Sequence, residues 1–284
     1  MSMHNLYRNM LAEYYMNAAN STKAIMKSFF NRIPGPDDLT REWILDFLMS
    51  YDNKKTRSIY FTLFKVTCKR LGKSELMEGI VVKEPKPDVT RADLLTPKEI
   101  AALLKAAQRP MMKATIELLI ESGCRIGELL PLMKEDITIE TDFLNVTFVG
   151  KTGTRHVPLL RENLLHFQYY ISTVESGRIF GKSVDTIRRY MVEIFKKVGV
   201  RKRKRTIHCF RHTKATYLVE SGVPEAMIRQ FMGWANTSKM IAVYAHLSNK
   251  SLKDYLARLH GKNIEPLEEF YPEEERRKMV DVLG

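Results

Sequence analysis

IHCFRHTKAT, residues 207–216, is separated by Thr206 alone from five consecutive basic residues at 201–205. Within it, His208 and Arg211 are three residues apart, a spacing that brings two side chains to one face of a helix. An imidazole can move a proton near neutral pH, and a guanidinium can hold two phosphate oxygens at once. The stretch therefore predicts a helix with a site for a phosphodiester; the alternative is a structural histidine behind a solvated basic loop.

The basic charge is concentrated around this stretch. The chain of 284 residues has a net charge of +13, and residues 96–262 alone hold 28 Lys and Arg against 15 Asp and Glu. Such an excess favours a polyanionic partner, and nucleic acid more than a membrane surface. Residues 263–284 instead hold 3 basic and 7 acidic residues, so this tail needs a different partner.

Several protein classes are disfavoured by the sequence. The three cysteines, Cys68, Cys124 and Cys209, are far apart, which argues against a disulfide framework or a zinc site and suits a reducing compartment. The N-terminal residues lack the apolar core of a signal peptide, and no stretch approaches 18 apolar residues. We therefore expect a cytoplasmic protein with no membrane segment, no metal and no cofactor.

The pattern of apolar and turn residues predicts a chain that is mostly α-helical with a small antiparallel β-sheet. Its parts are a helical domain over 1–82, a proline-containing linker over 83–95, a larger mixed domain over 96–262 and a tail helix over 263–284. The helices of the first domain are expected at 6–20, 23–32, 41–50 and 55–71. The last of these carries Lys65 and Lys69 on an apolar-backed helix, which could enter a DNA groove or simply be solvated.

In the larger domain, the strands are expected at 137–139, 144–149 and 155–159, with turns at 140–142 and 151–154. Helices are expected at 97–107, 110–122, 161–174, 184–198, 208–221, 224–233, around 244 and at 251–260. Thr96, Pro97 and Glu99 form the start signal of the first of these helices, because they combine an N-cap, a proline at the first position and a capping-box acid.

Two basic residues outside the opening stretch are candidates for the same site. Arg125 follows Gly123 where a new helix begins, so its guanidinium would add to free backbone donors, and Glu128 could hold it from one turn on. Lys151 lies at the expected hairpin tip, from which it could reach a minor groove and donate a proton. Taken singly, each is more often an ordinary surface residue.

Two aromatic residues complete the set. Trp234 follows Gly233 at a helix end, where its indole N–H is a fixed donor suited to a phosphate oxygen, although a core position is the commoner interpretation. A tyrosine hydroxyl is a poor nucleophile at its free pKa near 10. Beside two arginines, positive charge would favour the phenolate and make Tyr244 a usable nucleophile.

Four motifs in this order resemble the tyrosine recombinase (phage-integrase-type) family: SGCRIGEL at 122–129, GKTGTRHVPL at 150–159, HCFRHTKAT at 208–216 and YAHL at 244–247. The resemblance covers about residues 1–262. It implies a helical core-binding (SAM-like) domain and a mixed α/β catalytic domain. The Gly-Trp-Ala sequence at 233–235 and the ten-residue step from Trp234 to Tyr244 favour a divergent, Xer-like, archaeal lineage.

The resemblance also implies roles for individual residues. Arg125 and Arg211 would clamp the scissile phosphate, and Tyr244 would attack it to give a 3′-phosphotyrosine and a free 5′-hydroxyl. The remaining roles would fall to Lys151 as general acid, His208 in proton transfer, Trp234 as phosphate hydrogen-bonder and Glu128 as support. DNA contacts are expected from Lys65, Lys69, Arg201, Lys202, Arg203, Lys204 and Arg205.

The implied partner is double-stranded DNA, bound by a homotetramer on synapsed sites and by a monomer or dimer in isolation. The tail would dock on a neighbouring protomer or fold back on its own domain. The implied activity is site-specific recombination, either Xer-type chromosome-dimer resolution or integration and excision of a mobile element. A non-catalytic DNA-binding protein of the same fold and a type IB topoisomerase are the alternatives.

Overall fold

The computed structural model describes residues 20–83, 89–150, 153–201, 207–238 and 240–245. The chain forms two compact units, Met1–Pro87 and Asp88–Gly284, and each is described by itself. The division falls within the segment predicted as a linker. On the far side of it, Val89 and Leu95 are buried in the second unit, and Arg91 forms an ion pair with Glu220 at 2.7 Å.

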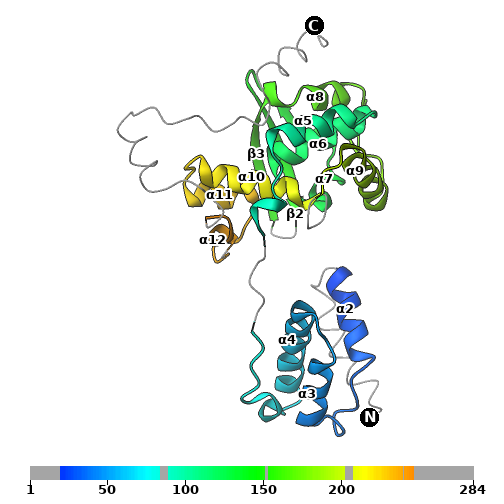
Figure 1. Ribbon diagram of the computed structural model, residues 1–284, viewed down its shortest axis with the longest axis vertical. Coiled ribbons are helices and arrows are strands. Elements are labelled where there is room, and N and C mark those ends of the chain that lie inside the picture. Colours follow the sequence, from blue (N-terminus) through cyan, green and yellow to red (C-terminus); the bar gives the residue numbers. More distant parts are fainter. Residues whose placement is uncertain (1–19, 84–88, 151–152, 202–206, 239, 246–284) are drawn as a thin grey trace. The chain divides into compact units, whose positions relative to one another are not determined.

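The first unit is helical, as its apolar pattern predicts (Figure 1). Its helices are α2 (Asn20–Phe30), α3 (Arg41–Met49) and α4 (Lys54–Arg70), followed by a 3-10 turn at Ser74–Met77. Asn53 caps α4 by accepting from the backbone N–H groups of Lys55 and Thr56. The core is an aromatic cluster around Phe29, whose ring packs edge-on against that of Phe64 with the ring centroids 4.8 Å apart. The helix predicted at 6–20 lies almost wholly outside the described residues.

The second unit surrounds a three-stranded antiparallel sheet in the order β1-β2-β3. The strands are β1 (Ile137–Ile139), β2 (Phe143–Gly150) and β3 (Gly153–Leu160). Alternate residues are buried, as a sheet with one covered face requires. Pairing runs from Phe143 opposite Leu160 to Gly150 opposite Gly153. β1 therefore has its predicted bounds, whereas β2 and β3 are longer than predicted, and Gly153 and Thr154 belong to β3 and not to the turn.

Helices cover the sheet and carry the rest of the core (Figure 1). They are α5 (Pro97–Ala106), α6 (Pro110–Ser122), α7 (Ile126–Leu129), α8 (Leu165–Ser172), α9 (Val184–Val198), α10 (His208–Glu220), α11 (Glu225–Met232) and α12 (Met240–Ala245), with 3-10 turns at Arg91–Asp93, Lys134–Asp136 and Arg161–Asn163. The observed fold is the predicted one: mostly α-helical with a small antiparallel sheet. In the described part of the chain, no helix combines the length and hydropathy of a membrane span.

Helix α6 is the central element of the second unit. It contacts α5, α8, α9 and α10, and it buries even its acidic residues. Glu121 pairs with Lys214 of α10 at 3.2 Å, and Glu117 accepts a hydrogen bond from the backbone N–H of Phe167 at 2.7 Å. The helix ends at Gly123, whose φ of +58° suits glycine, and this turn leads the chain directly to Arg125.

Candidate active site

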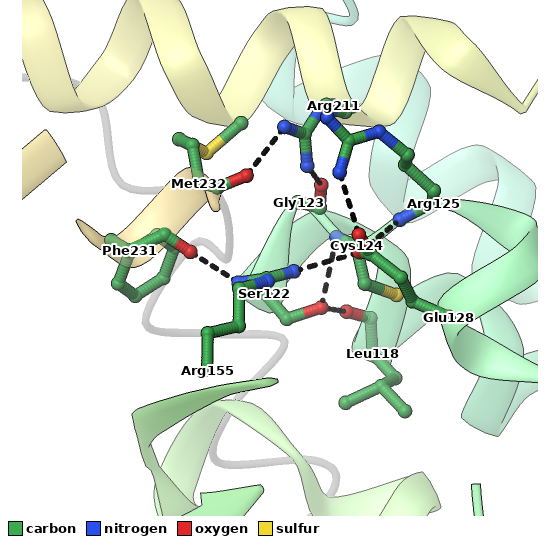
Figure 2. A network of polar contacts seen from close by, with 10 residues as sticks. All are labelled: Leu118, Ser122, Gly123, Cys124, Arg125, Glu128, Arg155, Arg211, Phe231 and Met232. Atoms are coloured by element: carbon green, nitrogen blue, oxygen red, sulfur yellow. Dashed lines mark hydrogen bonds and ion pairs between the residues drawn. The ribbon is translucent and has the colours of Figure 1, made fainter. Parts of the chain in front are cut away.

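Arg211 is anchored at the centre of the site (Figure 2). It is 6% exposed and lies in the first turn of α10. Its Nη1 donates to the carbonyl of Gly123 at 2.7 Å, and its Nη2 donates to the carbonyl of Met232 at 2.6 Å. Burial, followed by the positive charge of Arg125, lowers the pKa of Arg211 to about 10. The guanidinium is therefore fixed between the ends of α6 and α11 and stays charged at neutral pH.

Arg125 is held by a single carboxylate. Glu128 Oε1 accepts from Arg125 Nη1 at 2.6 Å, and Glu128 Oε2 accepts from the Arg125 backbone N–H at 2.9 Å. The backbone donor expected to be free is therefore used, because the acid one turn on caps the short helix α7. The Arg125 side chain remains 36% exposed, so its guanidinium can still meet a ligand.

Glu128 also binds a second arginine, Arg155, which was not among the residues predicted from the sequence. Arg155 Nη2 lies 3.0 Å from Glu128 Oε2, and the two side chains are 7% and 4% exposed. Arg155 Nη1 donates to the carbonyl of Phe231 in α11 (Figure 2). A sequence signal for this residue existed, since Arg155 has the same strand parity as the inward-facing Val157 and Leu159.

The protonation state of Glu128 follows from these partners. Burial alone would raise its pKa. The backbone N–H of Arg125, the charge of Arg155 and the side-chain hydrogen bonds from both arginines outweigh burial and hold the pKa of Glu128 below its usual range. Glu128 is thus a carboxylate that orients two arginines, one buried and one facing outward.

Tyr244 is the most buried of the candidate residues, at 1% exposure. Its ring stacks on Trp234 at a centroid distance of 5.5 Å and an interplanar angle of 7°. Its hydroxyl lies 2.9 Å from Nδ1 of His212. The Arg211 guanidinium carbon lies 5.7 Å from the centre of the Trp234 ring. The α10–α12 packing therefore brings tyrosine, tryptophan and arginine together from three parts of the sequence.

The two arginines favour the Tyr244 phenolate, as expected, but burial outweighs their effect. Burial raises the pKa of Tyr244 to about 12, although the charges of Arg211 and Arg125 act in the opposite direction. Desolvation of the phenolate is the larger effect because α12 packs the hydroxyl into the domain. The hydroxyl is therefore protonated at neutral pH.

His208 lies one helical turn before His212, the residue that contacts the Tyr244 hydroxyl. His208 is the first residue of α10, on the same helix as Arg211. Its ring centre lies 6.2 Å from that of His212. The hydrogen bond to the tyrosine hydroxyl is made by His212, a residue that was not predicted as functional although it lies inside the motif.

The other predicted residues lie at or beyond the edge of the described site. Lys151 is outside the described residues, between the paired Gly150 and Gly153. Arg201 is exposed just beyond α9, and the basic residues that follow it, Lys202, Arg203, Lys204 and Arg205, are also outside the described part. Lys65 and Lys69 are exposed on α4 of the first unit and line a hollow of ≈ 790 Å³ together with Arg70.

A hollow of ≈ 460 Å³ opens beside the arginine network, lined by residues of β3 and of the α11 end that include Arg155, His156, Arg229 and Trp234. Within the described ranges, no three His, Cys, Asp or Glu side chains gather as metal ligands do. The chemistry that these residues support is the binding of an anion by fixed guanidinium groups next to a tyrosine hydroxyl.

The chain is similar to known proteins in sequence and in fold. A model of the phage integrase family matches residues 93–251. The tyrosine recombinase XerA of Saccharolobus solfataricus is 27% identical over 250 residues, which cover 83% of each chain. Among solved structures, the Tn1549 transposon integrase in complex with circular intermediate DNA is similar with a TM-score of 0.68, at 16% identity and covering 91% of this chain and 99% of that one.

The XerH site-specific recombinase, in its post-cleavage complex with palindromic difH substrate, is similar with a TM-score of 0.60. Its identity to this chain is 16%, and the match covers 86% of this chain and 79% of that one. At such identities the solved structures establish a shared fold.

Proposed function

Since this chain belongs to the phage integrase family and is a site-specific tyrosine recombinase, we propose that it cleaves DNA with residues at the start of α7, on α10 and on α12, together with Lys151 and Trp234. Enzymes of this family cleave and rejoin DNA by transesterification on a tyrosine. The proposed nucleophile is Tyr244, and the proposed phosphate clamp is Arg125 with Arg211. Lys151, His208 and Trp234 complete the proposed set, and Glu128 supports it.

The observation that carries this proposal is the convergence of the tyrosine with both arginines. The charges of Arg211 and Arg125 both act on the Tyr244 hydroxyl, although the three residues are spread over more than a hundred positions. A phosphodiester held by the two guanidinium groups would therefore lie close to that hydroxyl. Fixed donors aimed at the developing charge of a transition state are the largest single contribution in many enzymes.

The reaction then proceeds in one displacement at phosphorus. The Tyr244 oxygen forms a bond to phosphorus while the bond to the 5′-oxygen of the next nucleotide breaks. The arginines hold the non-bridging oxygens, and Lys151 protonates the departing 5′-oxygen. The energy of the broken ester is kept in the phosphotyrosine, so attack by a 5′-hydroxyl can rejoin a strand without ATP.

Three residues support the reaction: Glu128 and Trp234 by positioning, and His208 in proton transfer. Glu128 fixes the direction of the Arg125 guanidinium, so that a half-exposed arginine is presented in one orientation. Trp234 packs on Tyr244 and can offer its indole N–H to a phosphate oxygen, while His208, at the start of α10, assists proton transfer on the phosphate side.

DNA outside the cleavage point would be held by basic surfaces on both units. In the first unit these are Lys65, Lys69 and Arg70 along α4, which fits a core-binding role for residues 1–82. In the second unit we expect such contacts from Arg201, which is exposed, and from the basic residues that follow it in the sequence, 202–205, which lie outside the described part. Replacing one lysine that binds a phosphate should make the affinity for DNA depend less steeply on salt concentration. Titrations of Lys65→Ala and Lys69→Ala at several salt concentrations would measure this change.

The assembly and the biological role follow as further parts of the proposal. A homotetramer on two synapsed sites, with the tail 263–284 docked on a neighbour, would complete recombination; light scattering with and without DNA tests this stoichiometry. The cellular role is Xer-type chromosome-dimer resolution in the cytoplasm, or integration and excision of a mobile element. Sequencing of the DNA ends trapped on the protein in its own cells separates the two.

The test of the nucleophile is covalent trapping on DNA. Wild-type protein should form a denaturant-resistant adduct on a nicked target site, and Tyr244→Phe should form none. Tyr169→Phe is the matched control, because Tyr169 is 51% exposed on α8 and away from the arginines. An adduct that survives in Tyr244→Phe excludes this tyrosine as nucleophile. Relaxation of plasmids that lack any specific site would favour a type IB topoisomerase, and absence of any adduct would favour a non-catalytic binder.

A further inference from the structure

We propose that His212 accepts the proton of the Tyr244 hydroxyl as the tyrosine oxygen attacks the DNA phosphate. This role rests on the proposed function, since it requires Tyr244 to be the nucleophile. It assigns a catalytic task to a residue next to the phosphate-binding Arg211 and distinct from His208.

The geometry suits a direct proton transfer. Nδ1 of His212 lies 2.9 Å from the hydroxyl oxygen, within the reach required of a general base. The two rings are tilted by 39° with centroids 5.9 Å apart, so the imidazole approaches the hydroxyl edge and leaves the stacking face of Tyr244 to Trp234. With the ring proton on Nε2, Nδ1 accepts the hydrogen bond that the tyrosine donates.

The helices fix this pair from both sides. His212 is half-buried on α10, one residue after the doubly anchored Arg211. Tyr244 is carried by α12, which packs on α10. The position of the base is therefore tied to the same helix that holds the phosphate-binding arginine.

The chemistry requires such an acceptor. The tyrosine hydroxyl is protonated at neutral pH, because burial raises its pKa to about 12. If the proton stayed on the oxygen during attack, the product would be a protonated, strongly acidic ester. A neutral imidazole takes up a proton in the physiological range, and general-base assistance of this kind contributes about 10²–10⁴ in rate.

Cleavage transfers two protons. The Tyr244 oxygen–phosphorus bond forms, the tyrosine proton passes to Nδ1 of His212, and the imidazole becomes imidazolium. The phosphorus–O5′ bond breaks, and the 5′-oxygen receives a proton from Lys151. On rejoining, the oxygen of a 5′-hydroxyl forms a bond to phosphorus and its proton returns to Lys151, while the bond between phosphorus and the Tyr244 oxygen breaks and that oxygen recovers its proton from His212.

The experiment compares two DNA substrates, one with the natural 5′-oxygen and one with sulfur at that bridging position. A thiolate leaves without protonation because thiols have a pKa near 8.5. Lys151→Ala should therefore be slow on the oxygen substrate and recover on the sulfur substrate. His212→Asn should be about 10²–10⁴-fold slower than wild type on both, because sulfur leaves unaided but the tyrosine proton still has no acceptor.

His212→Asn is the informative variant, since an amide can keep the hydrogen bond to Tyr244 but cannot carry away a proton. His212→Ala, which loses the bond as well, is the second variant, and gel shifts with thermal melts check that both still bind DNA and fold. A wild-type rate for His212→Asn, or recovery of that variant on the sulfur substrate, would overturn the inference. Because wild type is run alongside, loss of its own adduct would instead overturn the proposed function.

Discussion

The network around Glu128 makes a quantitative prediction about stability. Changing Glu128 to Gln keeps the shape of the side chain but removes the charge that two arginines share. Arg125 is 36% exposed, so water compensates for most of what it loses, as at other exposed ion pairs worth about 0–1 kcal/mol. Arg155 is 7% exposed and is left as a buried cation. Breaking a buried pair from one side costs about 3–5 kcal/mol.

Glu128→Gln should therefore lower the free energy of unfolding of the second unit by about 3–5 kcal/mol. Urea unfolding can be followed for this unit alone. Trp43 lies in the first unit and Trp234 in the second, so Trp234 fluorescence in a Trp43→Phe background reports on the second. The matched control is Arg155→Met in the same background, which removes the buried cation and leaves Glu128 with Arg125.

The double variant Glu128→Gln/Arg155→Met tests whether the stranded Arg155 charge is the cause of the loss. If the cost of Glu128→Gln is the stranded Arg155 charge, adding Arg155→Met should recover much of it, with a coupling of about 2 kcal/mol or more. Strictly additive losses, or a loss below about 0.5 kcal/mol for Glu128→Gln alone, would contradict the reasoning and show that the Glu128–Arg155 ion pair carries little energy.

The difference in stability between wild type and Glu128→Gln should depend on pH. The pKa of Glu128 is lowered in the folded chain from an ordinary value of 4.5, so the folded state binds this proton less readily than the unfolded state. The stabilisation is therefore fully present above pH 4.5 and is lost as the pH falls through the folded pKa. The difference in unfolding free energy between wild type and Glu128→Gln should be full at pH 7 and narrow below pH 4.5.

Two further changes test how the site is supported. A Cβ at Gly150 would lie 2.8 Å from Oε1 of Glu128, so Gly150→Ala should displace this carboxylate. In urea titrations the free energy of unfolding should fall by about 1–3 kcal/mol. Gly181→Ala is the control: its Cβ meets no atom within 4 Å, and the free energy of unfolding should change by under about 0.5 kcal/mol. Arg229 Nη1 donates to the carbonyls of Asn236 and Ser238, each at 2.7 Å, so Arg229→Met should release the loop after Trp234. The Trp234 emission should then shift to longer wavelength, and adduct formation should become slower. An unchanged emission would show that these two hydrogen bonds do not hold the loop in place.

Local patterns predicted the elements of the fold but not all of their limits. The helices α6 and α9 have the predicted bounds because proline, serine and glycine signals mark their ends. Helix α8 begins later than predicted, at Leu165 and not at 161. There, residues Arg161–Asn163 form a 3-10 turn, and the Arg161 guanidinium donates to the carbonyls of Glu140 and Thr141. Those carbonyls lie about twenty residues away in sequence, so no window around the helix contains them.

The site residues likewise include some that local sequence patterns indicate and some that depend on distant partners. The resemblance of the motifs to a known family pointed to Arg125, Arg211 and Tyr244, because their residue types and order are distinctive. It missed Arg155 and His212, since the importance of each depends on a partner elsewhere: Arg155 on an acid 27 positions earlier and His212 on a tyrosine 32 positions later. It also predicted the effect of the arginines on the pKa of Tyr244 but not the larger, opposite effect of burial, because burial depends on packing and not on the residue types in the motifs.

The sign of that pKa shift changes how the reaction must be assisted. If the arginines activated Tyr244 by charge alone, binding of DNA would work against them. A phosphodiester between Arg125 and Arg211 carries a negative charge that offsets theirs, and a nearby anion disfavours the phenolate. The tyrosine is thus hardest to ionise at the moment when its target arrives. Charge can stabilise the phosphate oxygens in the transition state, but removal of the tyrosine proton needs a base in contact with the hydroxyl, which is the position that His212 occupies at 2.9 Å.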